Sequence, residues 1–188
     1  IKNSRIDIEN FYSGVCGEEI FRDIYKKYET RLKENRLIDF DDMLSYTYEL
    51  FKERPDILAL WQNKYKYILI DEFQDINRLQ YEIIKMLAAP QNNLFIVGDD
   101  DQSIYRFRGS KPEIMLGFEK DYPNAKRILL DTNYRCGRYI VEASLNLISH
   151  NRERFDKKII AASKSKAPVT FADFENRRDE NIFLIRDI

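Results

Sequence analysis

The sequence has little of what marks a secreted, zinc-binding or membrane-spanning protein. Its 188 residues contain only two cysteines, Cys16 and Cys136, and one histidine, His150. Cysteines so far apart, with no Cys-x-x-Cys pair, predict neither a disulfide framework nor a zinc site, and they favour a reducing, cytoplasmic setting. No apolar run approaches the roughly 20 residues that cross a bilayer, so no contact with a membrane is expected.

The sequence also lacks a strong charge of either sign. Its formal net charge is −1, with 34% charged and 44% apolar residues, which is typical of an ordinary globular protein. No global basic field attracts nucleic acid, and any such binding must come from a local groove. The first residue is Ile1 in place of an initiator Met, which suggests an excerpt from a longer protein.

The apolar pattern predicts helices separated by short strands. Residues at helical spacing predict helices over 18–35, 40–51, 55–61, 77–88, 111–120, 137–150 and 179–188. Asp39 is expected to cap the second of these helices, and Ser110 with Glu113 to form a capping box that opens the helix ending near Lys120. Other apolar or alternating runs predict strands over 66–70, 94–97, 127–130 and 168–174, the first two of them buried. The basic stretch 151–166 is expected to be an exposed connection. Strands that alternate with helices indicate an α/β fold with a parallel sheet.

Two adjacent acids, Asp71 and Glu72, follow the first predicted strand. In open α/β sheets, ligands gather at the carboxyl ends of the strands. An Asp there can hold Mg²⁺, and a neighbouring Glu can activate water, which is the acidic half of a nucleotide triphosphatase site. The other half, a Gly-rich loop ending in Gly-Lys-Ser/Thr, is absent from these residues. Taken alone, the acids fit a solvated surface turn equally well.

A second acidic strand end favours the phosphate site. Gly98 and three aspartates follow the strand over 94–97, and Gln102 comes directly after them. A glutamine can donate to a γ-phosphate oxygen or position a water without adding repulsive charge. Asp100 and Asp101 individually are better explained as parts of a solvated turn.

Two further clusters fit a nucleotide-driven motor that binds nucleic acid: the first could contact the nucleic acid and the second the nucleotide. Tyr105, Phe107 and Arg108 follow Gln102, and such a cluster can stack on unpaired bases and clamp phosphates, although alone it is more often core packing. Tyr134 offers a face for an adenine. Arg135 can neutralise charge on a γ-phosphate as an arginine finger, although alone it fits an ordinary surface loop.

Together these segments resemble motifs of the UvrD/Rep/PcrA-type superfamily 1 DNA helicases. The sequences DEFQD (71–75), GDDDQSIYRFRG (98–109) and NYR (133–135) resemble the Walker B, phosphate-sensing and arginine-finger motifs, in the same order. Residues 37–44 and 121–125 resemble the helix start upstream of Walker B and the link between the motor domains. The resemblance covers nearly the whole chain, and the combination is highly specific.

The resemblance implies an α/β fold, a truncated, partial RecA-like (P-loop NTPase) parallel sheet flanked by helices. Residues 1–36 would end an inserted helical subdomain, residues 37–126 would form the second half of the first RecA-like motor domain, and residues 127–188 would begin the second motor domain. The implied activity is that of an ATP-dependent, 3′-to-5′ DNA helicase that couples ATP hydrolysis to translocation on single-stranded DNA and to duplex unwinding.

The resemblance also implies roles for individual residues, with ATP and Mg²⁺ as cofactors. Mg²⁺ binding and water activation would fall to Asp71 and Glu72, and the arginine finger would be Arg135. Nucleotide contacts would come from Gln74, Gln102, Tyr134 and Arg135. Single-stranded DNA would meet Tyr105, Phe107 and Arg108. Phe107 departs from the Trp usual at this position, which suggests a somewhat altered DNA grip.

The phosphate loop that the resemblance implies for the intact protein is absent from these 188 residues. Without that loop the isolated chain is expected neither to hydrolyse ATP nor to unwind DNA, and an exposed sheet edge would allow its copies to associate. Two other classes stay open. The chain could be a non-catalytic nucleic-acid-binding or interaction module, or a two-metal nuclease with a carboxylate site formed by Asp71, Glu72, Asp75 and Asp99.

Overall fold

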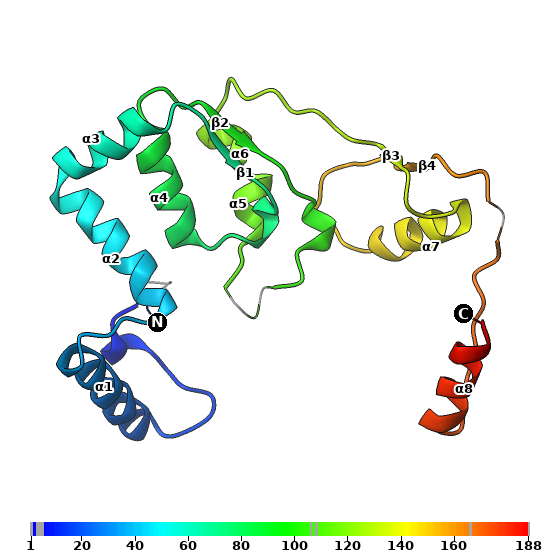
Figure 1. Ribbon diagram of the computed structural model, residues 1–188, viewed down its shortest axis with the longest axis horizontal. Coiled ribbons are helices and arrows are strands. Elements are labelled where there is room, and N and C mark those ends of the chain that lie inside the picture. Colours follow the sequence, from blue (N-terminus) through cyan, green and yellow to red (C-terminus); the bar gives the residue numbers. More distant parts are fainter. Residues whose placement is uncertain (1, 3–5, 106, 108, 166, 188) are drawn as a thin grey trace. The chain divides into compact units, whose positions relative to one another are not determined.

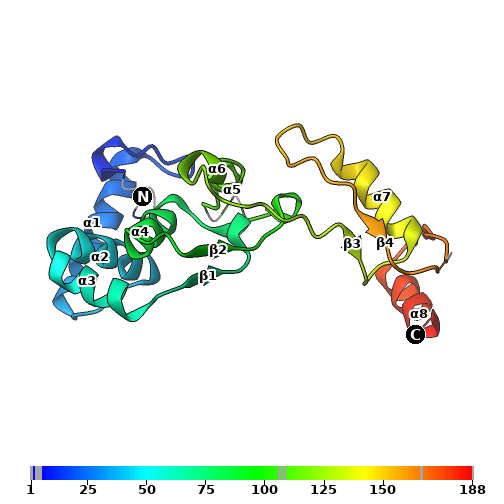
Figure 2. The same cartoon turned by 90° about the horizontal axis from the view of Figure 1, so that it is seen from above.

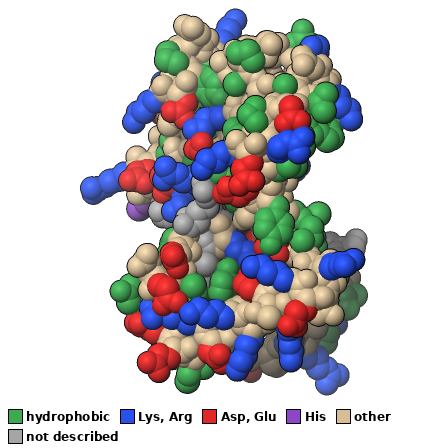
Figure 3. All heavy atoms as spheres, turned by 90° about the vertical axis from the view of Figure 1, so that its left-hand side faces the viewer, with side chains coloured by type: hydrophobic (Ala, Val, Ile, Leu, Met, Phe, Trp, Pro, Cys, Tyr) green, Lys and Arg blue, Asp and Glu red, His purple; other side chains and the backbone are tan. Residues whose placement is uncertain are grey.

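The computed structural model describes residues 2, 6–105, 107, 109–165 and 167–187 (Figure 1). The chain forms two compact units, residues 1–125 and residues 126–188, and each is described by itself. Within the described residues, no helix is both long and apolar enough to span a membrane. Basic and acidic side chains are interspersed on the face drawn in Figure 3, so no charge of one sign dominates it.

The first unit begins with helices whose ends follow local chemistry. Asp39 caps the second of them in a capping box, because its side chain accepts from the Asp42 amide while the Asp42 side chain accepts from the Asp39 amide. Pro55 occupies a first turn, where its missing N–H costs nothing. The elements are η2 (Ile8–Asn10), α1 (Glu18–Glu34), α2 (Phe40–Glu53) and α3 (Pro55–Lys64).

A two-stranded parallel sheet forms the centre of the first unit. β1 (Ile68–Ile70) pairs with β2 (Leu94–Ile96), and α4 (Arg78–Ala88) connects them (Figures 1 and 2). One face of this sheet packs on a buried cluster that includes Phe73 and Phe118. The remaining elements of the unit are η3 (Phe73–Asp75), η4 (Asp100–Gln102), α5 (Pro112–Leu116) and α6 (Phe118–Asp121).

The other face of this sheet is open, which corrects the prediction of buried strands. Leu69 and Phe95 are partners in the register, and their side chains are 71% and 58% exposed. Successive residues of a strand point to opposite faces, so only Ile70, Leu94 and Ile96 reach the core. Among the described residues, no element covers the side that carries Leu69 and Phe95.

The predicted capping box at Ser110 is also wrong. The helix begins at Pro112 after Lys111, and no side chain caps it. The Lys111 amide donates to the Ile76 carbonyl (3.0 Å), which fixes this segment against the core and leaves Ser110 buried. The predicted single helix is divided at Gly117 into α5 and α6.

The second unit contains a short parallel pair, β3 (Thr132–Asn133) with β4 (Ile160–Ala161), together with α7 (Arg138–Ile148) and α8 (Arg177–Asp187). The strands predicted over 127–130 and 168–174 do not form. β4 lies instead within the predicted exposed connection, because the Ile160 amide donates to the Asp131 carbonyl and the Ala162 amide to the Asn133 carbonyl, both at 2.8 Å. The position of this strand pair is therefore set by backbone hydrogen bonds between segments that are far apart in sequence.

A cluster of charged side chains joins α1 to α2. The Lys2 ammonium nitrogen lies 2.6 Å from Glu29, 2.8 Å from Asp39 and 2.7 Å from Asp42. The Tyr28 hydroxyl donates to Asp39 (2.9 Å). Burial raises the pKa of Asp39, but hydrogen bonds from Lys2, the Asp42 amide and Tyr28 outweigh burial and hold the pKa below its usual value.

Replacing Lys2 with methionine is expected to loosen α1 and α2, because the buried Asp42 carboxylate loses its cation. Breaking a buried ion pair costs about 3–5 kcal/mol. Since the folded pKa of Asp39 is lowered, its contribution is complete above the unfolded value of 3.8 and is lost only as pH falls through the lower folded value. Amide hydrogen exchange in the intact protein should therefore show a loss of protection in Lys2→Met that is nearly constant from about pH 5 to 8.

Lys27→Met is the matched control for this change. Lys27 pairs with Asp23 on the exposed face of α1 at 2.7 Å, and a surface pair of this kind contributes about 0–1 kcal/mol. Equal exchange rates in wild type and Lys2→Met would contradict the stabilising role assigned to the Lys2 cluster.

Candidate nucleotide-hydrolysis site

Asp71 and Glu72 lie directly after β1, and both are exposed. The Asp71 carboxylate accepts a hydrogen bond from the Glu72 amide (2.9 Å). Glu72 adopts a left-handed conformation, with φ 51° and ψ 40°. This conformation costs an L-residue about 1–2 kcal/mol, and strained residues of this kind gather at functional sites. The turn ends the strand sharply and begins η3 at Phe73.

The loop after β2 is organised around Asp99. One Asp99 oxygen accepts from the Asp101 amide (3.1 Å), and the other accepts from the Gln102 side-chain amide (2.9 Å). β1 and β2 are parallel, with Ile70 opposite Ile96, so both acidic segments lie at the carboxyl edge of the same sheet. The polar groups that follow the two strands therefore share one edge.

Gln74 joins these two strand ends directly. Its side-chain nitrogen donates to a Glu72 carboxylate oxygen (2.7 Å), and its side-chain oxygen accepts from the Asp99 amide (3.0 Å). The structure thus brings Glu72, Gln74, Asp99 and Gln102 into one chain of hydrogen bonds. The sequence did not predict this bridge, in which the Gln74 amide joins Glu72 to Asp99. A signal for it was Gly98, because a glycine at a strand end can mark a place where another segment approaches the backbone closely.

The aromatic residues expected to contact DNA follow this site. The rings of Tyr105 and Phe107 lie 6.0 Å apart at a tilt of 43°, and Phe107 is 77% exposed. The Ser103 hydroxyl donates to the Gln74 carbonyl (3.3 Å), which ties the start of this loop to η3. Arg108, the third predicted member, lies outside the described residues.

Tyr134 and Arg135 belong to the second unit, where they follow β3 and are exposed. The Asn133 side-chain oxygen accepts from the Arg135 amide (2.9 Å) and the Cys136 amide (2.8 Å). This Asx turn holds the backbone between β3 and α7, because one oxygen satisfies two consecutive donors.

The carboxylates do not gather as the nuclease alternative requires. Among the described residues, the groups of three or more acidic residues close enough to share a metal are Glu29 with Asp39 and Asp42, and Asp99 with Asp100 and Asp101. Neither group includes Asp71 or Glu72. The first group already surrounds the Lys2 ammonium.

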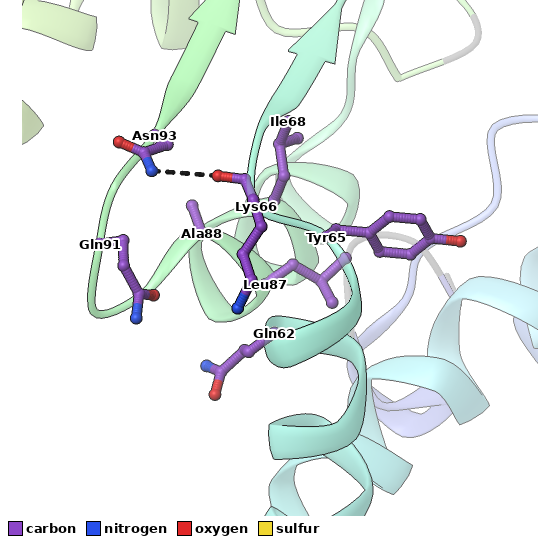
Figure 4. Close-up of a pocket in the computed structure, with 8 residues that line it drawn as sticks. All are labelled: Gln62, Tyr65, Lys66, Ile68, Leu87, Ala88, Gln91 and Asn93. Atoms are coloured by element: carbon purple, nitrogen blue, oxygen red, sulfur yellow. Dashed lines mark hydrogen bonds between the residues drawn. The ribbon is translucent and has the colours of Figure 1, made fainter.

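A small pocket lies at the opposite end of the sheet from the acids. Its walls come from the end of α3, the residues before β1, and the segment from α4 to β2 (Figure 4). The Asn93 side chain donates to the Lys66 carbonyl (3.0 Å) beside this pocket. No residue of the hydrogen-bonded chain from Glu72 to Gln102 lines the pocket, so it is separate from the candidate site.

The fold is α/β with short parallel sheets, and comparison with known proteins defines its family. The family model described as the UvrD/REP helicase N-terminal domain matches residues 2–123. The chain therefore belongs to the UvrD/REP helicase family, which confirms the resemblance seen in its motifs.

Named relatives agree with this assignment. The chain is 45% identical, over its whole length, to "Putative ATP-dependent DNA helicase YjcD" of Bacillus subtilis (strain 168), and covers 24% of that protein. It is 39% identical to ATP-dependent DNA helicase PcrA of Leuconostoc citreum, over 91% of the chain and 23% of the relative. It is 41% identical to the PcrA of Staphylococcus aureus (strain Mu50), over 88% of the chain and 23% of the relative. The chain thus spans about a quarter of the length of these relatives.

Proposed function

We propose that the intact protein containing these residues is an ATP-dependent DNA helicase that moves 3′ to 5′ on single-stranded DNA. The observation that carries the proposal is the hydrogen-bonded chain Glu72–Gln74–Asp99–Gln102 at the carboxyl edge of β1 and β2. It occurs in a chain whose relatives are named ATP-dependent DNA helicases. The direction of movement rests on the family resemblance.

The proposed fold of the intact protein extends what is observed. Residues 37–126 would form the second half of a RecA-like motor domain, preceded by the end of a helical subdomain over 1–36 and followed by the start of a second motor domain over 127–188. The open sheet face at Leu69 and Phe95 supports this proposal, since neighbouring apolar side chains exposed on a sheet face favour contact with a further element. Copies of the isolated chain would associate through an exposed edge of this sheet.

In this proposal, Asp71 and Glu72 serve Mg²⁺ and the attacking water. Their exposed carboxylates suit this ion, because Mg²⁺ prefers oxygen ligands and retains several waters. Bound Mg²⁺ would neutralise charge on the phosphates. Gln102, held by Asp99, would contact the γ-phosphate, and its neutral amide adds no repulsion.

The remaining roles follow from exposure and position. Tyr134 would stack near the adenine, and Arg135 would stabilise charge on the transferring phosphate. Tyr105 and Phe107 present exposed rings on which bases can stack, each stacked base being worth about 1–3 kcal/mol. Arg108, which follows Phe107 in the sequence, would clamp the DNA backbone.

The test compares the intact protein with the isolated 188-residue chain. The intact protein should hydrolyse ATP faster when single-stranded DNA is added, and it should unwind a duplex with a 3′ tail but not one with a 5′ tail. The isolated chain should not turn over ATP, because it has no Gly-Lys-Ser/Thr loop for the β- and γ-phosphates. DNA cleavage without nucleotide by the intact protein would support a nuclease, and DNA binding without ATP turnover would support a binding module.

A further inference from the structure

Gln74 differs from the other candidate site residues in its burial. It is 1% exposed, whereas Asp71, Glu72 and Gln102 are exposed. Both ends of its amide are occupied, one by the Glu72 carboxylate and the other by the Asp99 amide. A side chain so enclosed is poorly placed to touch a nucleotide directly, although it contacts two segments that would.

The bridge requires a residue that donates and accepts at once. The Glu72 carboxylate needs a donor, and the Asp99 amide needs an acceptor. Glutamine supplies both from one planar group. Glutamate could still accept from the Asp99 amide, but it would place a second negative charge against Glu72. Methionine would fill the same space and supply neither bond.

Gly98 makes room for this amide. A Cβ atom on Gly98 would lie 2.5 Å from the Gln74 side-chain oxygen, closer than such atoms can approach. It would also lie 3.1 Å from the Phe73 amide nitrogen and 3.2 Å from the Gln74 amide nitrogen, so these two backbone groups would have to shift by a few tenths of an ångström. The most severe contact is therefore with the Gln74 side chain.

The backbone around the bridge is also tied across the two strand ends. The Phe73 amide donates to the Val97 carbonyl (2.9 Å), and the Val97 amide donates to the Ile70 carbonyl (2.8 Å). The Ser103 hydroxyl reaches the Gln74 carbonyl, and Tyr105 and Phe107 lie a few residues further along that loop. A displacement of Gln74 would be felt at both the Glu72 carboxylate and this loop.

We propose that Gln74 is a positioning residue that orients the Glu72 carboxylate and fixes it relative to the Asp99–Gln102 loop, with Gly98 providing the space that the Gln74 amide needs. This inference rests on the proposed function. The family resemblance implies a direct nucleotide contact by Gln74. In the present proposal, Gln74 instead acts through Glu72 and the Asp99–Gln102 loop.

Gln74→Met in the intact protein should lower the DNA-stimulated kcat for ATP by about 10- to 100-fold, the usual effect of removing a hydrogen bond that orients a reacting group. The KM for ATP should stay near that of wild type, because Gln74 does not touch the nucleotide. Gln74→Glu, which keeps the volume and the acceptor, should show the same loss of kcat. If the loss in Gln74→Met came from altered packing alone, Gln74→Glu, which keeps the side-chain volume, would retain the kcat of wild type.

Gly98→Ala supplies an independent test. Alone it should reduce kcat, because its methyl group would displace the Gln74 amide. In a Gln74→Ala background the further loss should be smaller, since the closest atom it would strike is gone and only the contacts with the backbone nitrogens of Phe73 and Gln74 remain. Equal losses from Gly98→Ala in both backgrounds would overturn the proposed pairing.

Gln62→Met is the matched control. The Gln62 side chain also donates one hydrogen bond, to the Met86 carbonyl (2.8 Å), but it lies at the pocket at the far end of the sheet. It should leave kcat and KM unchanged. Wild-type kcat in Gln74→Met, or a raised KM with kcat unchanged, would overturn the positioning role alone. A wild-type protein without DNA-stimulated ATP turnover would overturn the proposed function and this inference together.

Discussion

Glu72→Gln in the intact protein should lower kcat for ATP by about 10²–10⁴-fold, the contribution typical of a residue that accepts a proton in the transition state. The change keeps the side-chain volume and an oxygen that can accept from Gln74, so the link to Asp99 should survive. What is lost is the charge that activates the attacking water. The affinities for ATP and for single-stranded DNA should therefore change little.

The measurement is steady-state ATP turnover with saturating DNA, together with the binding of a fluorescent ATP analogue. Glu82→Gln is the control, because Glu82 is a surface residue of α4 that pairs with Lys85 at 2.9 Å. Removal of that pair should leave kcat unchanged. Retained turnover in Glu72→Gln would disprove its role in water activation.

The second large effect is expected from Arg135→Ala. An arginine finger is worth about 10³–10⁵ in kcat, because it neutralises charge that develops on the transferring phosphate. The substitution leaves the Asx turn in place, since that turn uses the Asn133 side chain and the backbone amides of Arg135 and Cys136. A lysine at this position should restore only part of the activity, because it lacks the planar, forked group of donors.

Arg138→Ala is the matched control for Arg135. Arg138 lies three residues further along, and its guanidinium donates to Glu142 at 2.6 Å on the surface of α7. Loss of such a surface pair costs about 0–1 kcal/mol of stability and should leave kcat unchanged. If Arg135→Ala kept wild-type turnover while Arg138→Ala lost it, the finger would have been assigned to the wrong arginine.

The sequence predicted the helices well because their signals are local. The helix predicted over 18–35 is α1 (Glu18–Glu34), and the predicted N-cap Asp39 begins α2 with a complete capping box. The helix predicted over 77–88 is α4, with Asn77 as its cap. Caps and apolar periodicity act within a few residues, so they can be recognised without knowledge of the fold.

Strands and side-chain contacts were predicted less well because they depend on distant partners. The run over 127–130 looks like a strand, yet pairing occurs at Thr132–Asn133, where the neighbouring backbone bonds to Ile160 and Ala162. Ser110 resembles a cap, but the bond between Lys111 and Ile76 leaves it buried. In each case a hydrogen bond between segments far apart in sequence outweighed the local signal.

The sequence by itself determined the family of this chain, most of its helices, and which acids and amides follow the strands, since these features depend on residue types in a fixed order. Only the tertiary structure decided that Gln74 is buried between Glu72 and Asp99, and that Leu69 and Phe95 share an open face. Gln74 and Asp99 are 25 residues apart. Their hydrogen bond exists because the parallel register of β1 and β2 brings the two strand ends together, and no local pattern contains that register.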